Sequence, residues 1–495
     1  MTETTLTKRP PVVAIMGHID HGKSTLLAYI KKDAMRIEAG GITQHISAIE
    51  ITRNGNTITF IDTPGHEAFS GIRTRGARVA DIAVLVVSAE DGVKPQTIEA
   101  LNSITESKTP YIVAITKVDK PEANIERTKQ SLAENNIYVE GYGGSVSAVA
   151  VSGKSGAGVD ELLDLILLTA DIENLTGDAR LAGQGIVIES NLDIKKGISA
   201  TCIVKNGTLA KGMFVVAGTS MAPIRVIENW KGVMIDSATF SSPVKIIGWD
   251  SVPHVGDSFT TYSNKKDAEK YIASVAPAAA KAMAGKESLA GKSDVKNFPL
   301  IIKADTSGSL EAIIYQIQKF PHEKIIAQVI QSGIGTISEN DVRQTEGTVR
   351  AAIIGFNVKI DTQAKALAER NGVEIAQFDV IYKLSEWLEA KLLENTPLTE
   401  VEEITGIAKV LKTFSKVKDK QILGCRMENG RIMQGEQVNI LRRDAYIGLG
   451  RVKELQSQKN KISEVEEGKE FGTLVEAKFE IVPGDKLQAV TMVRK

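Results

Sequence analysis

Short apolar runs alternate with longer amphipathic stretches through the first third of the chain. Five runs of four to six residues stand at 12–16, 58–62, 82–87, 111–115 and 148–151. Runs of this length separated by helix-length segments predict a parallel sheet with helices on both faces, and 161–168 predicts one of those helices. In such a sheet, ligands bind beyond the carboxyl ends of the strands.

The pattern then changes to short β-branched runs punctuated by turn dipeptides, as in 197–218. This pattern predicts a small antiparallel barrel with Asn206-Gly207 as a hairpin turn. A similar pattern returns at 421–441, and Cys202 and Cys425 each precede an Asn-Gly pair by four residues. We interpret the two stretches as barrels of one type, with the cysteines as small core residues.

Composition narrows the class of protein. The 495 residues carry 60 Lys+Arg and 61 Asp+Glu, but residues 404–495 hold 18 basic and 12 acidic side chains, which hints at an anionic partner for that end. Two cysteines 223 residues apart exclude a zinc ribbon, an iron–sulfur site and a disulfide scaffold. No apolar run is long enough for a signal peptide or a membrane span, so we expect a cytoplasmic protein that contacts no membrane.

Residues 17–24, GHIDHGKS, fit the phosphate-loop pattern, follow a predicted strand and open a helix with apolar periodicity. In such loops backbone N–H groups converge on phosphates, and the helix N-terminus adds its dipole. Lys23 would reach the β- and γ-phosphates, and the Ser24 hydroxyl would bind Mg²⁺. The predicted nucleotide-binding residues of this loop are Gly17, His18, Ile19, Asp20, His21, Gly22, Lys23 and Ser24.

A second loop, DTPGH, follows directly on the apolar run 58–62. Asp62 can hold Mg²⁺ through water, and the Gly65 amide can approach a γ-phosphate with no Cβ in the way. His66 is the candidate for orienting the attacking water, because phosphoryl transfer depends mainly on positioning and charge stabilisation. Thr63 and Pro64 complete this predicted nucleotide-binding loop.

Two further segments predict selection of the base. The carboxylate of Asp119, in TKVD, can accept two hydrogen bonds from guanine, whereas adenine offers neither donor. Ser152, Gly153 and Lys154 would close the far side of the base. With Thr116 and Lys117, these residues complete the predicted nucleotide site.

The order GHIDHGKS, DTPGHEAF, TKVD and SGK resembles the translational GTPases. Four further sequence segments resemble the bacterial translation initiation factor two family: GGITQHI, KADTSGSLEA, SGIGTISENDV and IIGFNV. The resemblance implies a monomeric enzyme that uses GTP and Mg²⁺ and brings initiator formylmethionyl-tRNA to the small ribosomal subunit. It further implies that the protein promotes joining of the large subunit and leaves the ribosome after ribosome-stimulated hydrolysis.

The pattern and the resemblance together predict a multidomain α/β plus β chain. Its predicted parts are an N-terminal tail (1–9), a P-loop GTPase domain (10–175), a β-barrel (180–262), a linker (263–296), an α/β/α layer domain (297–383), a connecting helix and linker (384–403) and a C-terminal β-barrel that binds initiator tRNA (404–495).

The resemblance also assigns roles to single residues. Thr43 matches the family's switch threonine, which contacts Mg²⁺ and the γ-phosphate. His66 matches the family's water-orienting histidine, and Ile19 stands where an apolar gate residue is expected. Thr116 replaces the family's usual asparagine, so we expect an altered brace between the phosphate loop and the base. The family's long N-terminal extension has no counterpart before residue 17, so we do not expect extra anchoring to the small subunit through it.

The C-terminal barrel departs further from the family. Gly424-Cys425 matches the family's pocket, but Phe471 stands where a second cysteine is expected, and 456–458 replace a basic-aromatic stretch. Basic side chains there could contact tRNA phosphates. The predicted tRNA-binding residues are Cys425, Glu470, Phe471, Gly472, Arg442 and Arg443. Two alternatives stay open: an elongation or rescue GTPase of the ribosome, and a GTP-gated RNA-binding scaffold with negligible turnover.

Overall fold

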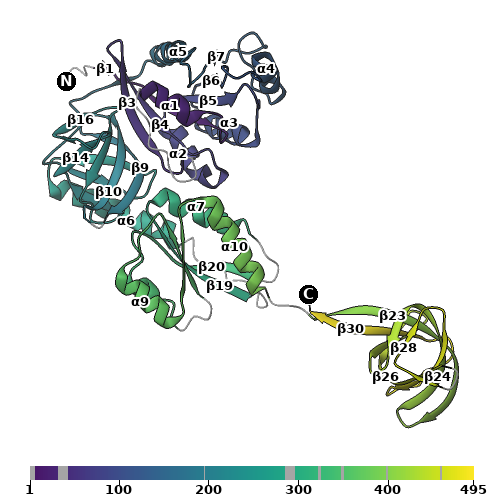
Figure 1. The fold of residues 1–495 in the computed structure, drawn as a ribbon. Coiled ribbons are helices and arrows are strands. Elements are labelled where there is room, and N and C mark those ends of the chain that lie inside the picture. Colours follow the sequence, from purple (N-terminus) through teal and green to yellow (C-terminus); the bar gives the residue numbers. More distant parts are fainter. Residues whose placement is uncertain are drawn as a thin grey trace. The chain divides into compact units, whose positions relative to one another are not determined.

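The computed structural model describes residues 6–31, 43–193, 195–284, 296–320, 325–346, 351–396, 400–457 and 460–494. The chain forms two compact units, Met1–Asn395 and Thr396–Lys495 (Figure 1). Across the described ranges, no helix combines the length and the apolar character needed to cross a bilayer.

The N-terminal domain is built on a six-stranded sheet of order β3-β4-β2-β5-β6-β7, parallel except for the pairing of β3 with β4. This sheet confirms the predicted α/β class. The strands are β2 (Val12–Gly17), β3 (Ser47–Arg53), β4 (Asn56–Asp62), β5 (Ile82–Ser88), β6 (Tyr111–Thr116) and β7 (Ala148–Ala150). The helices are α1 (Lys23–Lys31), α2 (Ser70–Val79), α3 (Pro95–Ser107), α4 (Ile125–Glu134) and α5 (Val159–Ile172).

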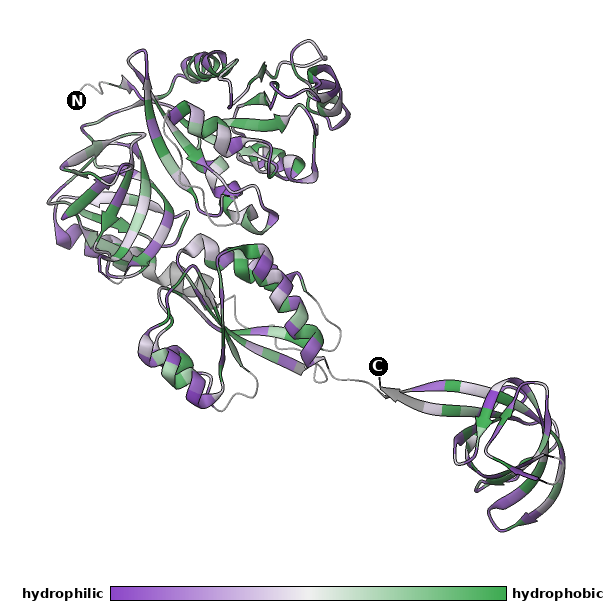
Figure 2. Ribbon diagram, in the orientation of Figure 1, coloured by the Kyte–Doolittle hydropathy of each residue, from purple (hydrophilic) through white to green (hydrophobic). Residues whose placement is uncertain are grey.

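Burial explains why the central strands read as continuous apolar runs. Every residue of β2 and β5 is buried, because helices cover both faces of the sheet, and hydropathy colouring shows these strands as hydrophobic (Figure 2). Since β2, β4 and β6 run parallel, their carboxyl ends meet at one edge. The three predicted nucleotide-binding loops, 17–24, 62–66 and 116–119, start at that edge.

The chain before β2 is not wholly a tail. β1 (Thr7–Lys8) pairs with β8 (Thr176–Gly177), while residues 1–5 of the predicted tail lie outside the described residues. The predicted linker begins with helix α6 (Lys265–Ala284), and its residues 285–295 also lie outside them.

The first barrel is an eight-stranded sheet of order β13-β12-β18-β9-β10-β17-β14-β15 with the small pair β11-β16 beside it. Its strands are β9 (Gln184–Asp193), β10 (Gly197–Asn206), β11 (Thr208–Ala210), β12 (Phe214–Ala217), β13 (Ser220–Pro223), β14 (Val226–Asn229), β15 (Met234–Ile235), β16 (Ser237–Thr239), β17 (Pro243–Ile247) and β18 (Ser258–Tyr262). Cys202 is buried in the core, as predicted.

The predicted hairpin at Asn206-Gly207 is wrong. β10 pairs with β9 and β17, whereas β11 pairs with β16, so the dipeptide joins strands that do not pair with each other. A type I′ turn needs positive φ at both residues, and only Gly207, at 73°, has it. The glycine instead permits a close chain approach, since a Cβ there would lie 2.1 Å from the carbonyl oxygen of Ala182.

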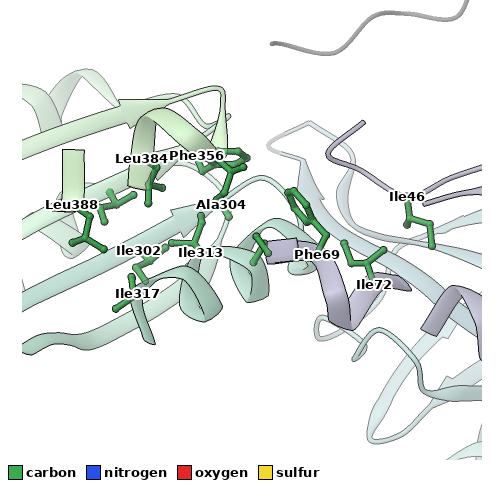
Figure 3. Packing of buried hydrophobic residues seen from close by; sticks show 14 of the residues in the cluster. Ile46, Phe69, Ile72, Ile302, Ala304, Ile313, Ile317, Phe356, Leu384 and Leu388 are labelled. Atoms are coloured by element: carbon green, nitrogen blue, oxygen red, sulfur yellow. The ribbon is translucent and has the colours of Figure 1, made fainter. Parts of the chain in front are cut away.

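The α/β/α domain has a four-stranded parallel sheet of order β20-β19-β21-β22. Its hydrophobic core is continuous with the N-terminal domain, because Ile46, Phe69 and Ile72 belong to the same buried cluster as Ile302 and Ile313 (Figure 3). Its elements are β19 (Lys296–Ala304), α7 (Ser307–Gln318), β20 (Ile325–Ile334), α8 (Glu339–Arg343), β21 (Ala352–Phe356), α9 (Thr362–Asn371), β22 (Glu374–Phe378) and α10 (Ile381–Asn395).

The second unit is an antiparallel barrel. Its sheet runs β23-β30-β25-β26-β29-β24-β28, β27 pairs with β26, and a further pairing of β23 with β24 closes the sheet. The strands are β23 (Glu400–Val417), β24 (Lys420–Met433), β25 (Gln437–Arg442), β26 (Ala445–Ser457), β27 (Asn460–Ile462), β28 (Glu464–Glu466), β29 (Glu470–Glu476) and β30 (Lys486–Arg494).

Asp81 ties the first barrel to the N-terminal domain. Its carboxylate accepts hydrogen bonds from Arg9 at 2.6 and 2.7 Å, from Lys205 at 2.7 Å and from the backbone N–H of Val12 at 2.9 Å. Burial alone would raise the pKa of Asp81, but the hydrogen bond from Arg9 and the charge of Lys205 bring it below its ordinary value.

We predict that Asp81→Asn lowers the free energy of unfolding by about 3 kcal/mol at pH 7, because it leaves two partly buried cations without their counter-charge. A carboxylate whose pKa is lower in the folded state gives its full stabilisation at pH values above its unfolded pKa of about 3.9. This stabilisation is lost as the pH falls through the folded pKa. Urea titrations at pH 7 and pH 3 should therefore show a smaller difference between the two proteins at pH 3. Equal stability at pH 7 would contradict the assignment.

Candidate nucleotide-binding site

The phosphate loop passes from β2 into α1. Gly17 is required at its start, since a Cβ there would lie 2.4 Å from the carbonyl oxygen of Val86. Lys23 is buried, and its Nζ donates hydrogen bonds to the carbonyl oxygens of Gly17 at 3.0 Å and His18 at 2.6 Å. Burial lowers the pKa of Lys23 to about 8, against the opposing charge of Asp62. The loop thus holds a poorly solvated cation at a position suited to an anion.

The remaining side chains of the loop support its shape. The rings of His18 and His21 meet edge to face, with centroids 4.8 Å apart. Burial, followed by the charge of His18, lowers the pKa of His21 to about 3, so His21 is neutral at pH 7. The backbone N–H of Ile19 donates to Gln96 Oε1 at 3.0 Å, and Asp20 adopts a positive φ of 60°.

Three oxygen-bearing side chains from separate segments converge in front of α1. Ser24 Oγ lies 2.9 Å from Thr43 Oγ1, and Thr43 Oγ1 donates to Asp62 Oδ2 at 3.3 Å. Hydroxyl and carboxylate oxygens are the ligands that Mg²⁺ prefers in nucleotide sites. The structure therefore brings together the three predicted metal ligands, and their chemistry fits that ion.

The 62–66 loop closes the same cavity. Thr63 Oγ1 donates to the carbonyl oxygen of Ile15 at 2.8 Å, which fixes the loop on the sheet. A Cβ on Gly65 would lie 2.6 Å from Lys23 Nζ and 3.0 Å from the backbone nitrogen of Ile19. The cavity measures about 180 Å³ and is lined by Ile19, Asp20, Gly22, Lys23, Ser24, Thr25, Thr43, Gly65 and His66.

His66 begins the 3₁₀ turn η2 (Glu67–Phe69). Its Nδ1 accepts a hydrogen bond from the backbone N–H of Ala68 at 2.9 Å, so the proton of the neutral ring is on Nε2. Burial, with the nearby charge of Arg73, lowers the pKa of His66 to about 4, and the ring is neutral at pH 7. Its ring contacts the ring of Tyr382 in a tilted arrangement, with centroids 4.4 Å apart.

Arg73 is a functional residue that sequence reasoning missed. Its buried guanidinium donates to the carbonyl oxygens of Pro64 at 3.3 Å, Gly65 at 3.1 Å and His66, and pairs with Glu99 at 2.5 Å. It therefore supports the backbone of the 62–66 loop. A signal was present, because Arg73 falls four residues before Ala77 on the apolar face of α2, where a charge has to be explained.

The two segments predicted to select the base also meet. Ser152 Oγ donates to Asp119 Oδ1 at 2.6 Å, and this bond lowers the pKa of Asp119 below its ordinary value. The same Oγ accepts the backbone N–H of Lys154 at 3.2 Å, which brings Gly153 against the start of α1. Lys117, with φ of 60°, pairs with Glu90 at 2.9 Å.

Thr116 still reaches the phosphate loop. Its hydroxyl donates to the carbonyl oxygen of His21 and lies 3.3 Å from that of Val87. The threonine hydroxyl thus contacts the phosphate loop from the end of β6, three residues before Asp119.

The predicted tRNA-binding residues divide between the inside and the outside of the C-terminal barrel. Cys425 and Phe471 are buried in its core, and burial raises the pKa of Cys425 to about 12. Arg442 forms a two-point ion pair with Asp485, with both N–O distances 2.9 Å. Glu470 and Arg443 are exposed, and Gly472 is half-buried and pairs with Gln456. Gln458, in the stretch that departs from the family, lies outside the described residues.

Three family models match successive parts of the chain. They are the elongation factor Tu GTP binding domain at residues 8–171, elongation factor G domain 2 at 182–262 and translation-initiation factor 2 at 275–389. Together with the phosphate loop, the oxygen cluster and the Asp119 segment, these matches give the chain the domain order of the translational GTPase class.

Curated relatives narrow this class. Translation initiation factor IF-2 of Agrobacterium fabrum is 40% identical over 98% of this chain and 54% of that relative, and the same factor of Allorhizobium ampelinum is 39% identical over 98% and 53%. The chain is similar to translation initiation factor IF-2 over nearly its whole length, and it spans about half the length of these relatives. A solved structure, that of GDP-bound aIF5B from Aeropyrum pernix, is 24% identical with a TM-score of 0.48 and covers 98% of this chain and 92% of that chain.

The close packing at Gly65 predicts how a methyl group there changes nucleotide binding. Gly65→Ala should weaken GTP about tenfold to a hundredfold, because overpacking by one methyl costs about 1–3 kcal/mol. GDP, which lacks the γ-phosphate, should keep its affinity within about twofold. Calorimetric titration with each nucleotide measures the difference. Gly71→Ala is the matched control, since a Cβ there meets nothing closer than 3.4 Å, and equal losses for both nucleotides would contradict the placement.

The buried cysteines predict slow thiol chemistry. Burial raises the pKa of both Cys202 and Cys425, so neither supplies a thiolate at pH 8 in the native state. Ellman's reagent should label fewer than about one tenth of the thiols before unfolding and both in urea. Rapid native labelling of Cys425, tested against Cys425→Ser, would show that this sulfur faces the barrel exterior.

Proposed function

We propose that this chain is a translation initiation GTPase that works in the cytoplasm. It binds GTP with Mg²⁺, promotes binding of initiator formylmethionyl-tRNA to the small ribosomal subunit and subunit joining, and leaves after ribosome-stimulated hydrolysis. The observation that carries the proposal is the convergence of Ser24, Thr43 and Asp62 beside Lys23, in a chain 40% identical to an initiation factor over nearly all its length.

Each part of the nucleotide would meet a different segment. Backbone N–H groups of 17–24 and the Lys23 ammonium bind the phosphates, and the Asp119 carboxylate accepts the two guanine donors. Ser24 and Thr43 would hold Mg²⁺ directly and Asp62 through water; when bound, the ion neutralises charge on the β- and γ-phosphates.

Hydrolysis requires a positioned water more than covalent chemistry. His66 lines the phosphate cavity, and its neutral ring can orient water by a hydrogen bond. Ile19 lies on the same cavity and acts as the apolar gate that limits access to the histidine. Loss of the γ-phosphate removes the contacts that favour the ordered arrangement of Thr43 and Gly65, and this shifts the population of conformers.

The initiator role depends on the C-terminal barrel, and it is tested by binding. Formylated and unformylated initiator tRNA are titrated against the full chain at fixed salt, because phosphate contacts are salt-dependent. A preference for the formylated form supports an initiation factor, whereas no preference favours an elongation or rescue GTPase. Turnover of GTP that is negligible with and without ribosomes favours a GTP-gated RNA-binding scaffold.

We predict that His66→Ala retains GTP affinity within about twofold and loses ribosome-stimulated turnover by about a hundredfold or more, the range of a positioned proton-transfer or water-orienting group. Calorimetry measures the affinity, and phosphate release with ribosomes measures turnover. His254→Ala, at an exposed histidine of the first barrel, is the matched control and should behave as wild type. Full turnover in His66→Ala would remove this histidine from the mechanism.

A further inference from the structure

The first turn of α10 lies against the nucleotide loops of the N-terminal domain. Tyr382, the second residue of this helix, places its ring 4.4 Å from that of His66 with an interplanar angle of 58°. Tyr382 is also close enough to Asp20 for the charge of that carboxylate, after burial, to raise the tyrosine pKa. The tyrosine therefore contacts His66 and lies within electrostatic range of the phosphate loop.

Two contacts hold the His66 ring in one orientation. The backbone N–H of Ala68 occupies the Nδ1 lone pair at 2.9 Å, and the ring of Tyr382 packs against the histidine ring in a tilted arrangement. With Nδ1 engaged and the proton on Nε2, neither ring nitrogen presents a free lone pair that could accept a proton from water. In this arrangement Nε2 can only donate a hydrogen bond, and His66 cannot orient the attacking water by accepting one from it until the ring turns.

The position of Tyr382 is set by the residue that follows Thr43. Gln44 Nε2 donates to the carbonyl oxygen of Asp379 at 2.9 Å, and the backbone N–H of Ile381 donates to Gln44 Oε1 at 3.2 Å. One amide thus clamps the start of α10 from both sides. Because Thr43 belongs to the oxygen cluster, a displacement of this segment moves the clamp and the tyrosine relative to His66.

We propose that Tyr382 is a positioning residue that holds His66 in a resting orientation, so that GTP hydrolysis requires a shift of α10. The inference rests on the proposed GTPase function and adds a residue from the α/β/α domain to its control. The contact suppresses ribosome-independent turnover and makes hydrolysis depend on whatever displaces the start of α10.

The test measures single-turnover GTP hydrolysis by the full chain without ribosomes. Tyr382→Ala should raise the rate about tenfold, equivalent to about 1.4 kcal/mol in the barrier, with the dissociation constant for GTP unchanged within about twofold. Tyr382→Phe retains the ring and should restore the slow wild-type rate. The double variant Tyr382→Ala with His66→Ala should be as slow as His66→Ala alone, because the released group is the histidine.

Tyr138→Ala is the matched control, since Tyr138 is 47% exposed against 45% for Tyr382 and lies in the same unit. Should Tyr382→Ala lower the melting temperature, Tyr382→Leu keeps apolar bulk without the ring and should also accelerate hydrolysis. A wild-type or reduced rate in both variants, or acceleration that persists without His66, overturns the inference. If the wild-type chain binds no GTP, the proposed function itself fails. If turnover on ribosomes depends on His66 but Tyr382→Ala leaves the ribosome-independent rate unchanged, only the inference fails.

Discussion

The arrangement of the predicted nucleotide-binding loops depends on the contacts of the Thr43 hydroxyl. It links Ser24 at the start of α1 to Asp62 at the end of β4. The residues that follow it leave the nucleotide site in other directions. Gln44 binds the start of α10, His45 Nε2 lies 2.8 Å from Asp305 Oδ2, and Ile46 enters the apolar cluster shared with the α/β/α domain. Four consecutive residues thus join the phosphate site to a second domain.

Magnitudes indicate which of these contacts can change. A neutral hydrogen bond contributes about 0.5–1.5 kcal/mol net, and an ion pair at the surface such as Glu67–Lys319 about 0–1 kcal/mol. Full burial of a side chain such as Phe69 or Ile72 is worth about 1.5–3 kcal/mol each. The polar contacts are therefore weak enough for a ligand with a preference of a few kcal/mol to rearrange, while the apolar cluster provides the more persistent attachment.

Local chemistry explains why the sheet and the phosphate loop could be predicted. The runs at β2 and β5 are apolar throughout because both faces of the sheet are covered. A lysine that follows two glycines between a strand and a helix is typical of a phosphate-binding loop. Arg73 could have been found from its place on an apolar helix face. The contact of Tyr382 with His66 and the Gln44 clamp could not, because each joins residues more than 300 positions apart and each residue is unremarkable in its own segment. The Asn206-Gly207 turn failed for a related reason, since a dipeptide does not reveal which strands pair on either side of it.

Strand pairing also explains the positions at which the C-terminal barrel departs from the family's sequence. Paired residues of an antiparallel sheet point to one face, and Cys425 pairs with Phe471, with both side chains in the core. The next pairs, Gly424 with Gly472 and Arg426 with Glu470, belong to the outer face.

Replacement of the family's second cysteine by Phe471 therefore changes what fills the barrel and leaves the outer row in place. On that row a Cβ at Gly424 would lie 3.1 Å from the ring of Phe414, so the ring lies beside this glycine. A ligand on this face would meet main chain, an aromatic ring and the charges of Arg426 and Glu470, and the buried sulfur of Cys425 would take no part in its recognition.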